Sequence, residues 1–319
     1  MKKNFFLIFI ILYSNINLKS LEEKMNNSII YLLNENSINY EIYNEFNYIE
    51  NKYKNNEEQR INKKFNLYRK LNALRKPGNL TEKYIEDESF LSQLILKKGI
   101  IEINNLSPIT FNYKIKNKNN SEFSILNNIY LWKGDITRLK LDAIVNAANN
   151  QLLGCWVPLH NCIDNIIFSY AGVQLRNEMD NIMKKQGKIE ETGKAKISNG
   201  YYLPSKYIIH TVGPQVIGIL TGEDKKLLKN SYLNVLKLAK KYNIKSLAFC
   251  CISTGVFNFP NDEAADIAIN TVINFLKENK NINMKIIFNV YKDLDEIIYK
   301  KKLNEKIENI KLNFNNEEL

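Results

Sequence analysis

The chain has 319 residues, of which 45% are hydrophobic, and it carries a formal net charge of +11. This length can bury a substantial core in one large or two modest domains. The four cysteines, two of them adjacent at Cys250 and Cys251, do not form the pattern of a disulfide scaffold and fit reduced thiols. The positive charge alone is weak support for a nucleic-acid surface, because lysine and asparagine are abundant throughout the sequence.

The N-terminus has the order of a signal or targeting segment, which we place at residues 1–20. Lys2 and Lys3 precede an apolar run at residues 5–13, as a basic n-region precedes an apolar h-region. The run is too short to span a bilayer, and no small-residue cleavage pattern stands out. Two interpretations stay open: entry to the secretory pathway or an organelle, or an apolar N-terminus on a cytoplasmic chain. No membrane span is expected after this segment.

Residues 28–122 are expected to form a helical N-terminal extension and a linker, ending in a polar, low-complexity loop at residues 114–122. Within it, residues 60–76 predict a helix with a basic face and no acidic residue. Its basic residues are Arg60, Lys63, Lys64, Arg69, Lys70, Arg75 and Lys76. This face could bind phosphates, but we favour a solvated face on a docked helix.

Two short strands follow, and polar residues stand directly after each. Residues 129–132 read as a buried strand that ends at Gly134, and Asp135 comes next, where open α/β sheets bind ligands. Residues 143–145 form a second apolar run that brings Asn146 and Asn149 to the same edge. Their carboxamides suit a hydroxyl-rich ligand such as a ribose. The alternative for each motif alone is a simple turn after a strand.

The most specific pattern is Cys155, His160 and Cys162, spaced C-x4-H-x-C in a chain with few histidines. Thiolate and imidazole are the ligands of tetrahedral zinc, and a set of three leaves one position open for water or substrate, as in catalytic zinc sites. The alternative is a disulfide between Cys155 and Cys162 with His160 on the surface. We favour zinc.

The rest of the chain alternates between helices and strands. Residues 163–185 predict one long helix with Asp164 in its first turn, as a capping residue or as a group near the metal. His210 lies inside a strand at residues 207–212 and is expected to be a core histidine rather than a fourth ligand. A buried strand at residues 246–252 leads into a glycine-containing turn before a helix, and such a turn can hold a diphosphate.

The last strand, residues 285–291, brings Tyr291 to the carboxyl edge, where its ring could flank adenine or simply pack. Residues 293–302 predict a closing helix, and residues 304–319 a polar tail.

Together these motifs resemble the macrodomain family. The matching segments are GDIT at 134–137, DAIVNAAN at 142–149 and ISTGVFNFP at 252–260. GCWVPLHNCIDN at 154–165 is similar to the zinc-containing branch of that family, whose members are ADP-ribosyl hydrolases. Two departures are Phe168, where relatives commonly have His, and Trp156, where they commonly have Phe. Phe168 removes a possible polar partner near the site and puts any role of that His in doubt here. Trp156 should preserve an aromatic wall.

The resemblance implies a role for each matching residue. Asp135 would accept a hydrogen bond from the adenine amino group, with the Ile136 backbone beside it. Asn149 would orient the distal ribose, which Asp164 would face, and both are candidate catalytic residues. The loop that would hold the diphosphate is Ser253, Thr254, Gly255, Val256 and Phe257.

We therefore expect a three-layer α/β/α macrodomain with a mixed sheet at residues 123–303, behind the helical extension. The predicted reaction is zinc-dependent removal of mono-ADP-ribose from a modified protein side chain, with Asp164 positioning or deprotonating a group at the metal. The alternative is a non-catalytic module that binds ADP-ribose and uses zinc structurally. Expected partners are ADP-ribose and ADP-ribosylated protein, including the lipoylated carrier protein to which bacterial members are linked. We expect a monomer that does not bind nucleic acid.

Overall fold

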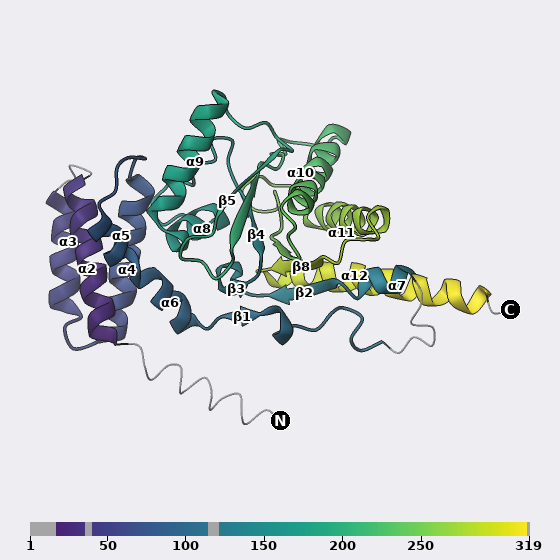
Figure 1. Cartoon of the computed structure of the whole chain (residues 1–319), viewed down its shortest axis with the longest axis horizontal. Helices are drawn as coiled ribbons and strands as arrows, with labels where there is room; N and C mark the ends of the chain where they lie inside the picture. Colours follow the sequence, from purple (N-terminus) through teal and green to yellow (C-terminus); the bar gives the residue numbers. More distant parts are fainter. Residues whose placement is uncertain (1–16, 36–39, 114–120, 318–319) are drawn as a thin grey trace.

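The protein is described by a computed structural model covering residues 17–35, 40–113 and 121–317 (Figure 1). Residues 1–16, which hold most of the expected targeting segment, and residues 114–120 of the expected polar loop lie outside the described residues. Within the described ranges, no helix combines the length and apolarity needed to cross a bilayer.

A six-stranded mixed sheet forms the centre of the C-terminal part of the chain. Its strands are β2 (Ile129–Lys133), β4 (Ala143–Ala147), β5 (Ala195–Asn199), β6 (Tyr207–Thr211), β7 (Ser246–Phe249) and β8 (Lys285–Val290). They lie in the order β2, β8, β7, β4, β6, β5, with β5 antiparallel to β6 and the other neighbouring pairs parallel. The carboxyl ends of β2 and β4 therefore lie at the same edge of the sheet. This agrees with the prediction that Asp135 and Asn149 lie at one edge.

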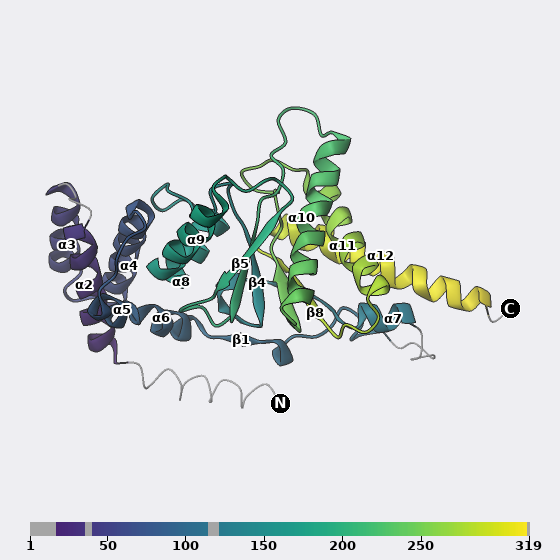
Figure 2. The same ribbon diagram turned by 45° about the horizontal axis from the view of Figure 1, so that its top comes forward.

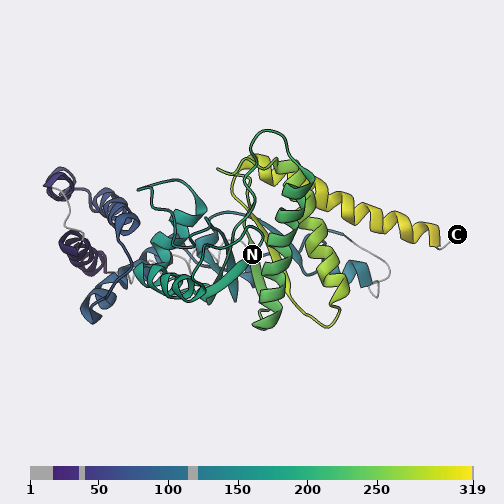
Figure 3. The same cartoon turned by 90° about the horizontal axis from the view of Figure 1, so that it is seen from above.

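Helices cover both faces of this sheet, which confirms the predicted three-layer arrangement (Figures 2 and 3). One side holds α8 (Ile163–Ala171) and α9 (Val173–Gln186), and the other holds α10 (Gly222–Lys241), α11 (Asn261–Glu278) and α12 (Asp293–Glu317). The smaller elements are β1 (Ile101–Glu102), η1 (Ile103–Asn105), α7 (Ser121–Leu126), η2 (Ile136–Arg138) and β3 (Leu139–Lys140). β1 and β3 pair in a separate two-stranded sheet.

The N-terminal extension is helical, as expected, and packs beside α8 (Figure 1). Its helices are α2 (Leu18–Glu35), α3 (Tyr40–Lys52), α4 (Glu57–Leu74), α5 (Glu82–Glu88) and α6 (Phe90–Lys98). The extension therefore begins earlier than residue 28. α4 begins after Asn56, whose side chain accepts a hydrogen bond from the Gln59 N–H and so satisfies one free donor of the first turn.

The basic face of α4 is not the solvated surface that we expected. Lys64 is fully buried and forms ion pairs with Glu22 of α2 and Glu50 of α3. Arg60 also pairs with Glu22, and Lys70 pairs with Glu45. The acidic partners come from neighbouring helices, so the basic run on α4 holds the extension together and offers few free cations for phosphate.

The predicted single helix at residues 163–185 is instead two helices that break at Gly172. The backbone N–H of Gly172 still donates to the Phe168 carbonyl, but its φ of +90° ends α8, and glycine adopts this conformation without steric cost. A Cβ at Gly172 would lie 2.8 Å from a carboxyl oxygen of Glu88. The ring of Tyr202 would lie equally close, so both the backbone conformation and the close neighbours require glycine at the break.

The closing helix also differs from the prediction, because α12 continues past Lys302 to Glu317 through the expected polar tail. Leu303, Ile307 and Ile310 are buried at helical spacing, so this segment carries an apolar stripe that anchors the helix.

Glu88 at the end of α5 should make stability depend on pH. The carboxyl group is fully buried, and one oxygen accepts hydrogen bonds from the Tyr68 and Tyr84 hydroxyls and from the Val173 N–H, while the other has no partner. Burial raises the pKa of Glu88 to about 7. Because this folded-state pKa lies above the unfolded value, the stability that the protonated form contributes is lost as pH rises from about 4.5 through about 7.

The Glu88→Gln variant removes this titration. Wild type loses stability between about pH 5 and about pH 8, and the variant does not. The difference in unfolding free energy, variant minus wild type, is therefore expected to rise by about 2 kcal/mol between these two pH values, which urea denaturation at each pH measures. A difference between variant and wild type that does not change with pH would contradict the assignment.

Candidate active site

Asp135 lies at the carboxyl end of β2, where the sequence predicted it, and caps η2. One carboxylate oxygen accepts hydrogen bonds from the Thr137 N–H at 3.1 Å and from the Thr137 hydroxyl at 2.6 Å. The other oxygen lies 3.1 Å from the ammonium of Lys98, at the end of α6. The side chain remains one-quarter exposed, so a ligand can reach it. Ile136 is buried beside it, and its backbone begins η2.

Asn149 and Asn146, at the end of β4, make different hydrogen bonds. The Asn149 side chain donates to an Asp164 oxygen at 3.3 Å and to the Gly154 carbonyl at 3.0 Å. Asn146 is fully buried, and its side-chain contacts are within the protein. Its amide donates to the other oxygen of Asp164 at 2.7 Å and contacts Nδ1 of His210 at 3.0 Å. Asn146 therefore supports Asp164 from below.

His210 is a core histidine, as the sequence analysis predicted. Burial lowers the pKa of His210 to about 3, so the ring is neutral at physiological pH. The NH₂ group of Asn146 can only donate, which assigns Nδ1 of His210 as the acceptor and the ring proton to Nε2, 2.9 Å from the Ser198 hydroxyl. Both ring nitrogens are thus used within the protein.

Asp164 is buried in the first turn of α8, between the two asparagines. Burial raises the pKa of Asp164 to about 6, while the hydrogen bond from Asn146 and the charge of Arg176 act in the opposite direction. A carboxyl group with this pKa can exchange a proton near neutral pH.

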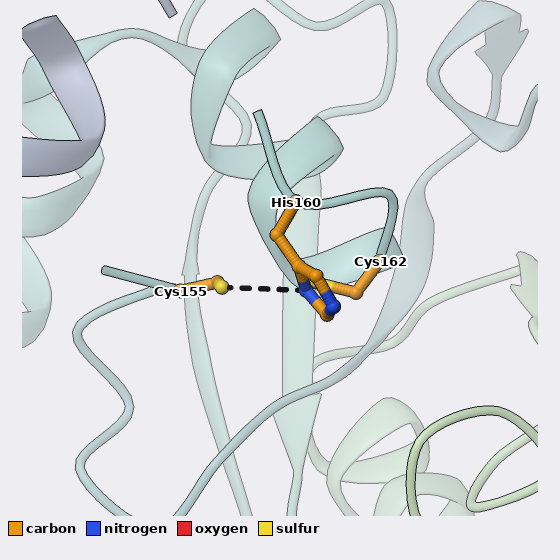
Figure 4. Close-up of side chains that lie close together, drawn as sticks. All are labelled: Cys155, His160 and Cys162. Atoms are coloured by element: carbon orange, nitrogen blue, oxygen red, sulfur yellow. Dashed lines mark hydrogen bonds between the residues drawn. The ribbon is translucent and has the colours of Figure 1, made fainter. Parts of the chain in front are cut away.

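Cys155, His160 and Cys162 come together, and their side chains extend toward one another (Figure 4). One ligand atom from each lies within 4.8 Å of the other two, and Sγ of Cys155 lies 3.6 Å from Nδ1 of His160. Tetrahedral zinc, with bonds to sulfur and nitrogen of about 2.3 and 2.0 Å, would separate these two atoms by about 3.5 Å. The arrangement therefore fits zinc. The cysteines are free thiols, so the disulfide alternative does not describe this structure.

Local structure explains why these three side chains meet. Gly154 has a φ of +83°, and a Cβ there would lie 2.7 Å from the ring of Phe168, so only glycine lets the chain turn into Cys155. Cys162 is the N-cap of α8. Burial raises the pKa of Cys162 to about 12, with the neighbouring Cys155 adding to the shift, so a metal ion must displace a proton from this sulfur.

The two departures from the family pattern pack near this loop. Phe168 is buried, so no polar group from that position faces the site. The Trp156 indole N–H donates to Gln151 at 2.9 Å, and the Arg176 guanidinium lies 4.3 Å from the Trp156 ring centroid. Arg176 also donates to the carbonyls of Asn72, Ala73 and Arg75 near the end of α4. The spacing of residues on α9 could not predict this contact between Arg176 and the end of α4.

The loop after β7, which is expected to hold the diphosphate, turns sharply at Ser253. Ser253 has a φ of +66° and is buried, and its hydroxyl has no hydrogen-bond partner. Gly255 faces open space, and Val256 is exposed. The Phe257 carbonyl accepts a hydrogen bond from the Val216 N–H, which ties this loop to the segment after β6. Free donors in a turn of this kind can bind phosphate oxygens.

Tyr291 follows β8 and is 76% exposed, so its ring is available to a ligand and does not pack in the core. A separate hollow of about 550 Å³ lies at the opposite, amino ends of β4, β6 and β7, where Asp142, Ser205 and Ser246 contribute to its wall. It contains none of the predicted site residues.

Comparisons with known proteins identify the family to which this fold belongs. A family model described as "Macro domain" matches residues 145–268. A curated relative from Treponema medium, named "Protein-ADP-ribose hydrolase", is 46% identical over 236 residues, which cover 74% of this chain and 85% of the relative.

Two solved structures also match. A Trypanosoma brucei macrodomain in complex with ADP-ribose is 28% identical, with a TM-score of 0.55, and the match covers 73% of this chain and 94% of that one. An Oceanobacillus iheyensis macrodomain with MES bound is 37% identical, with a TM-score of 0.52, covering 57% of this chain and 93% of that one.

Proposed function

This chain belongs to the macrodomain family, and on that premise we propose that it is a zinc-dependent hydrolase that removes mono-ADP-ribose from modified protein side chains. The observation that carries the proposal is the convergence of Cys155, His160 and Cys162 immediately before Asp164. The relative named "Protein-ADP-ribose hydrolase" supports the activity, and the Trypanosoma brucei macrodomain in complex with ADP-ribose supports the ligand.

The ligand would lie along the carboxyl edge of the sheet. Asp135 would accept a hydrogen bond from the adenine amino group on the oxygen that faces Lys98, with the Ile136 backbone beside the base. The exposed ring of Tyr291 would flank adenine. Free N–H groups of the turn at residues 253–257 would bind the diphosphate.

The distal ribose would then face Asn149 and Asp164. Hydrolysis breaks the bond between the anomeric carbon and the protein side chain, and water supplies the hydroxyl for the sugar and the proton for the side chain. Cys155, His160 and Cys162 would hold a zinc ion, which would supply Lewis-acid chemistry beside the distal ribose. Asp164 would take the proton from the attacking water, and Asn149 would hold Asp164 in place.

Only the resemblance to the zinc-containing branch suggests which protein is the substrate. The zinc-containing branch implies a lipoylated carrier protein as one candidate, and mono-ADP-ribosylated proteins in general as the class.

The test uses the full chain with a mono-ADP-ribosylated protein as substrate. We expect release of free ADP-ribose, loss of release after treatment with a zinc chelator, and recovery when Zn²⁺ is added back. A binding module would instead retain ADP-ribosylated protein without releasing ADP-ribose, with or without metal. Nucleic-acid binding, the third option, predicts retention on RNA or DNA that falls steeply with salt.

A further inference from the structure

Asn165 connects the two segments that carry the metal-ligand candidates. Its backbone N–H donates to Sγ of Cys162 at 3.4 Å. Its side-chain amide donates to the carbonyl oxygen of Val157 at 3.1 Å and to that of Cys155 at 3.5 Å. Because Asn165 is buried, water cannot readily replace these donors. One residue of α8 therefore fixes the loop bearing Cys155 against the helix end formed by Cys162.

Arg69 of α4, in the N-terminal extension, controls how this amide is oriented. Its Nη2 donates to Oδ1 of Asn165 at 2.9 Å, and its Nε donates to the Ser169 hydroxyl at 3.3 Å. A guanidinium can only donate, so the Asn165 oxygen must face Arg69 and the amide NH₂ must face the loop carbonyls. Ser169 in turn donates to the Asn165 carbonyl at 2.7 Å. The two donors of Arg69 thus hold Asn165 from the side opposite the metal loop.

We propose that Arg69, acting through Asn165, is a positioning residue for the metal site, so that the helical extension sets how tightly Cys155, His160 and Cys162 bind a divalent cation. The inference rests on the proposed function, because it requires these three residues to be metal ligands. Groups that orient metal ligands from the outer shell typically change metal affinity by about 10- to 100-fold when they are removed.

The same helix offers a control that separates this role from simple helix docking. Lys70 is the next residue of α4, and its ammonium pairs with Glu45 of α3, 2.7 Å away, rather than with α8. Replacing Lys70 with Met removes the same charge and a packing contact from the same helix. If Arg69 only docked α4, its replacement would lower stability without changing the metal affinity of the folded protein.

The experiment measures the Zn²⁺ affinity of the full chain by competition with a chromophoric chelator, and the absorption spectrum of the Co²⁺-substituted protein. Arg69→Met is expected to weaken Zn²⁺ binding by about tenfold and to shift the Co²⁺ bands, and Lys70→Met to change neither. Arg69→Lys keeps the charge but lacks the two-pronged donor geometry, so a smaller loss is expected. Asn165→Ala should weaken binding as Arg69→Met does, and the double variant no further, because both act along one path.

Wild-type Zn²⁺ affinity in folded Arg69→Met would overturn the proposal, and so would an equal loss in Lys70→Met. Circular dichroism establishes folding. If Arg69→Met does not fold, Asn165→Ala takes its place, and wild-type Zn²⁺ affinity in that variant would likewise overturn the proposal. A wild-type chain that binds no Zn²⁺ would remove the inference together with the metal part of the proposed function. Binding and release of ADP-ribose by the same preparation then show whether the rest of that function stands.

Discussion

Replacing Cys155 or His160 with alanine is expected to lower the rate of ADP-ribose release by about two orders of magnitude or more, while ADP-ribose still binds. Each replacement leaves two of the three converging ligand atoms, and two protein ligands hold zinc far more weakly than three. Neither residue belongs to the proposed binding positions for adenine or the diphosphate. The measurements are the metal content, the affinity for ADP-ribose and the turnover of modified protein.

Cys251→Ala is the matched control for the loss of a thiol. Cys251 lies outside the cluster, and its thiol donates to the Asn289 carbonyl, 3.8 Å away. We expect this variant to keep its zinc and its turnover. Unchanged turnover in both Cys155→Ala and His160→Ala would make the metal proposal wrong, even if the protein hydrolyses ADP-ribosylated substrates by another route.

Asp164→Asn is expected to lower kcat by roughly 10²- to 10³-fold without a comparable change in the affinity for ADP-ribose, because the amide cannot accept the proton. The substitution keeps the shape of the side chain, but its amide can accept from Asn146 or Asn149 through only one oxygen. Turnover under saturating substrate, compared with the equilibrium affinity for ADP-ribose, separates the chemical step from binding.

Asp180→Asn on α9 provides the control, because Asp180 is paired only with Lys184 on its own helix among the ion pairs of the described residues. Equal zinc content in the Asp164 variant and wild type would show that the metal site is intact. If such a preparation also kept wild-type kcat, Asp164 would have only a structural role in the first turn of α8.

Much of the site could be predicted because its parts are local in sequence or follow from the parallel sheet. Asp135 and Asn149 stand at strand ends that a parallel sheet must bring to one edge. Cys155, His160 and Cys162 lie within a single loop, so their spacing alone predicted a cluster. His210 was predicted correctly from its place inside a strand.

The misses come from contacts between distant segments. Asn146 follows its strand as Asn149 does, and only the packing of α8 over β4 shows that it lies beneath Asp164. Lys98 reaches Asp135 across 37 residues, and Arg69 reaches Asn165 across 96. Periodicity described the α4 face correctly as basic but could not reveal that acidic residues of α2 and α3 neutralise it. At Gly172, likewise, Glu88 and Tyr202 come from distant segments and leave no room for a side chain.

The strand order has a consequence for synthesis of the chain. β2 pairs along its whole length with β8, and the Gly134 N–H donates to the Val290 carbonyl. During translation, the segment that presents Asp135 must therefore wait for residues 285–290 to leave the ribosome before it gains its neighbouring strand. A nascent chain stalled before residue 285 would lack the wall on which adenine is expected to rest, even with Cys155, His160 and Cys162 already made.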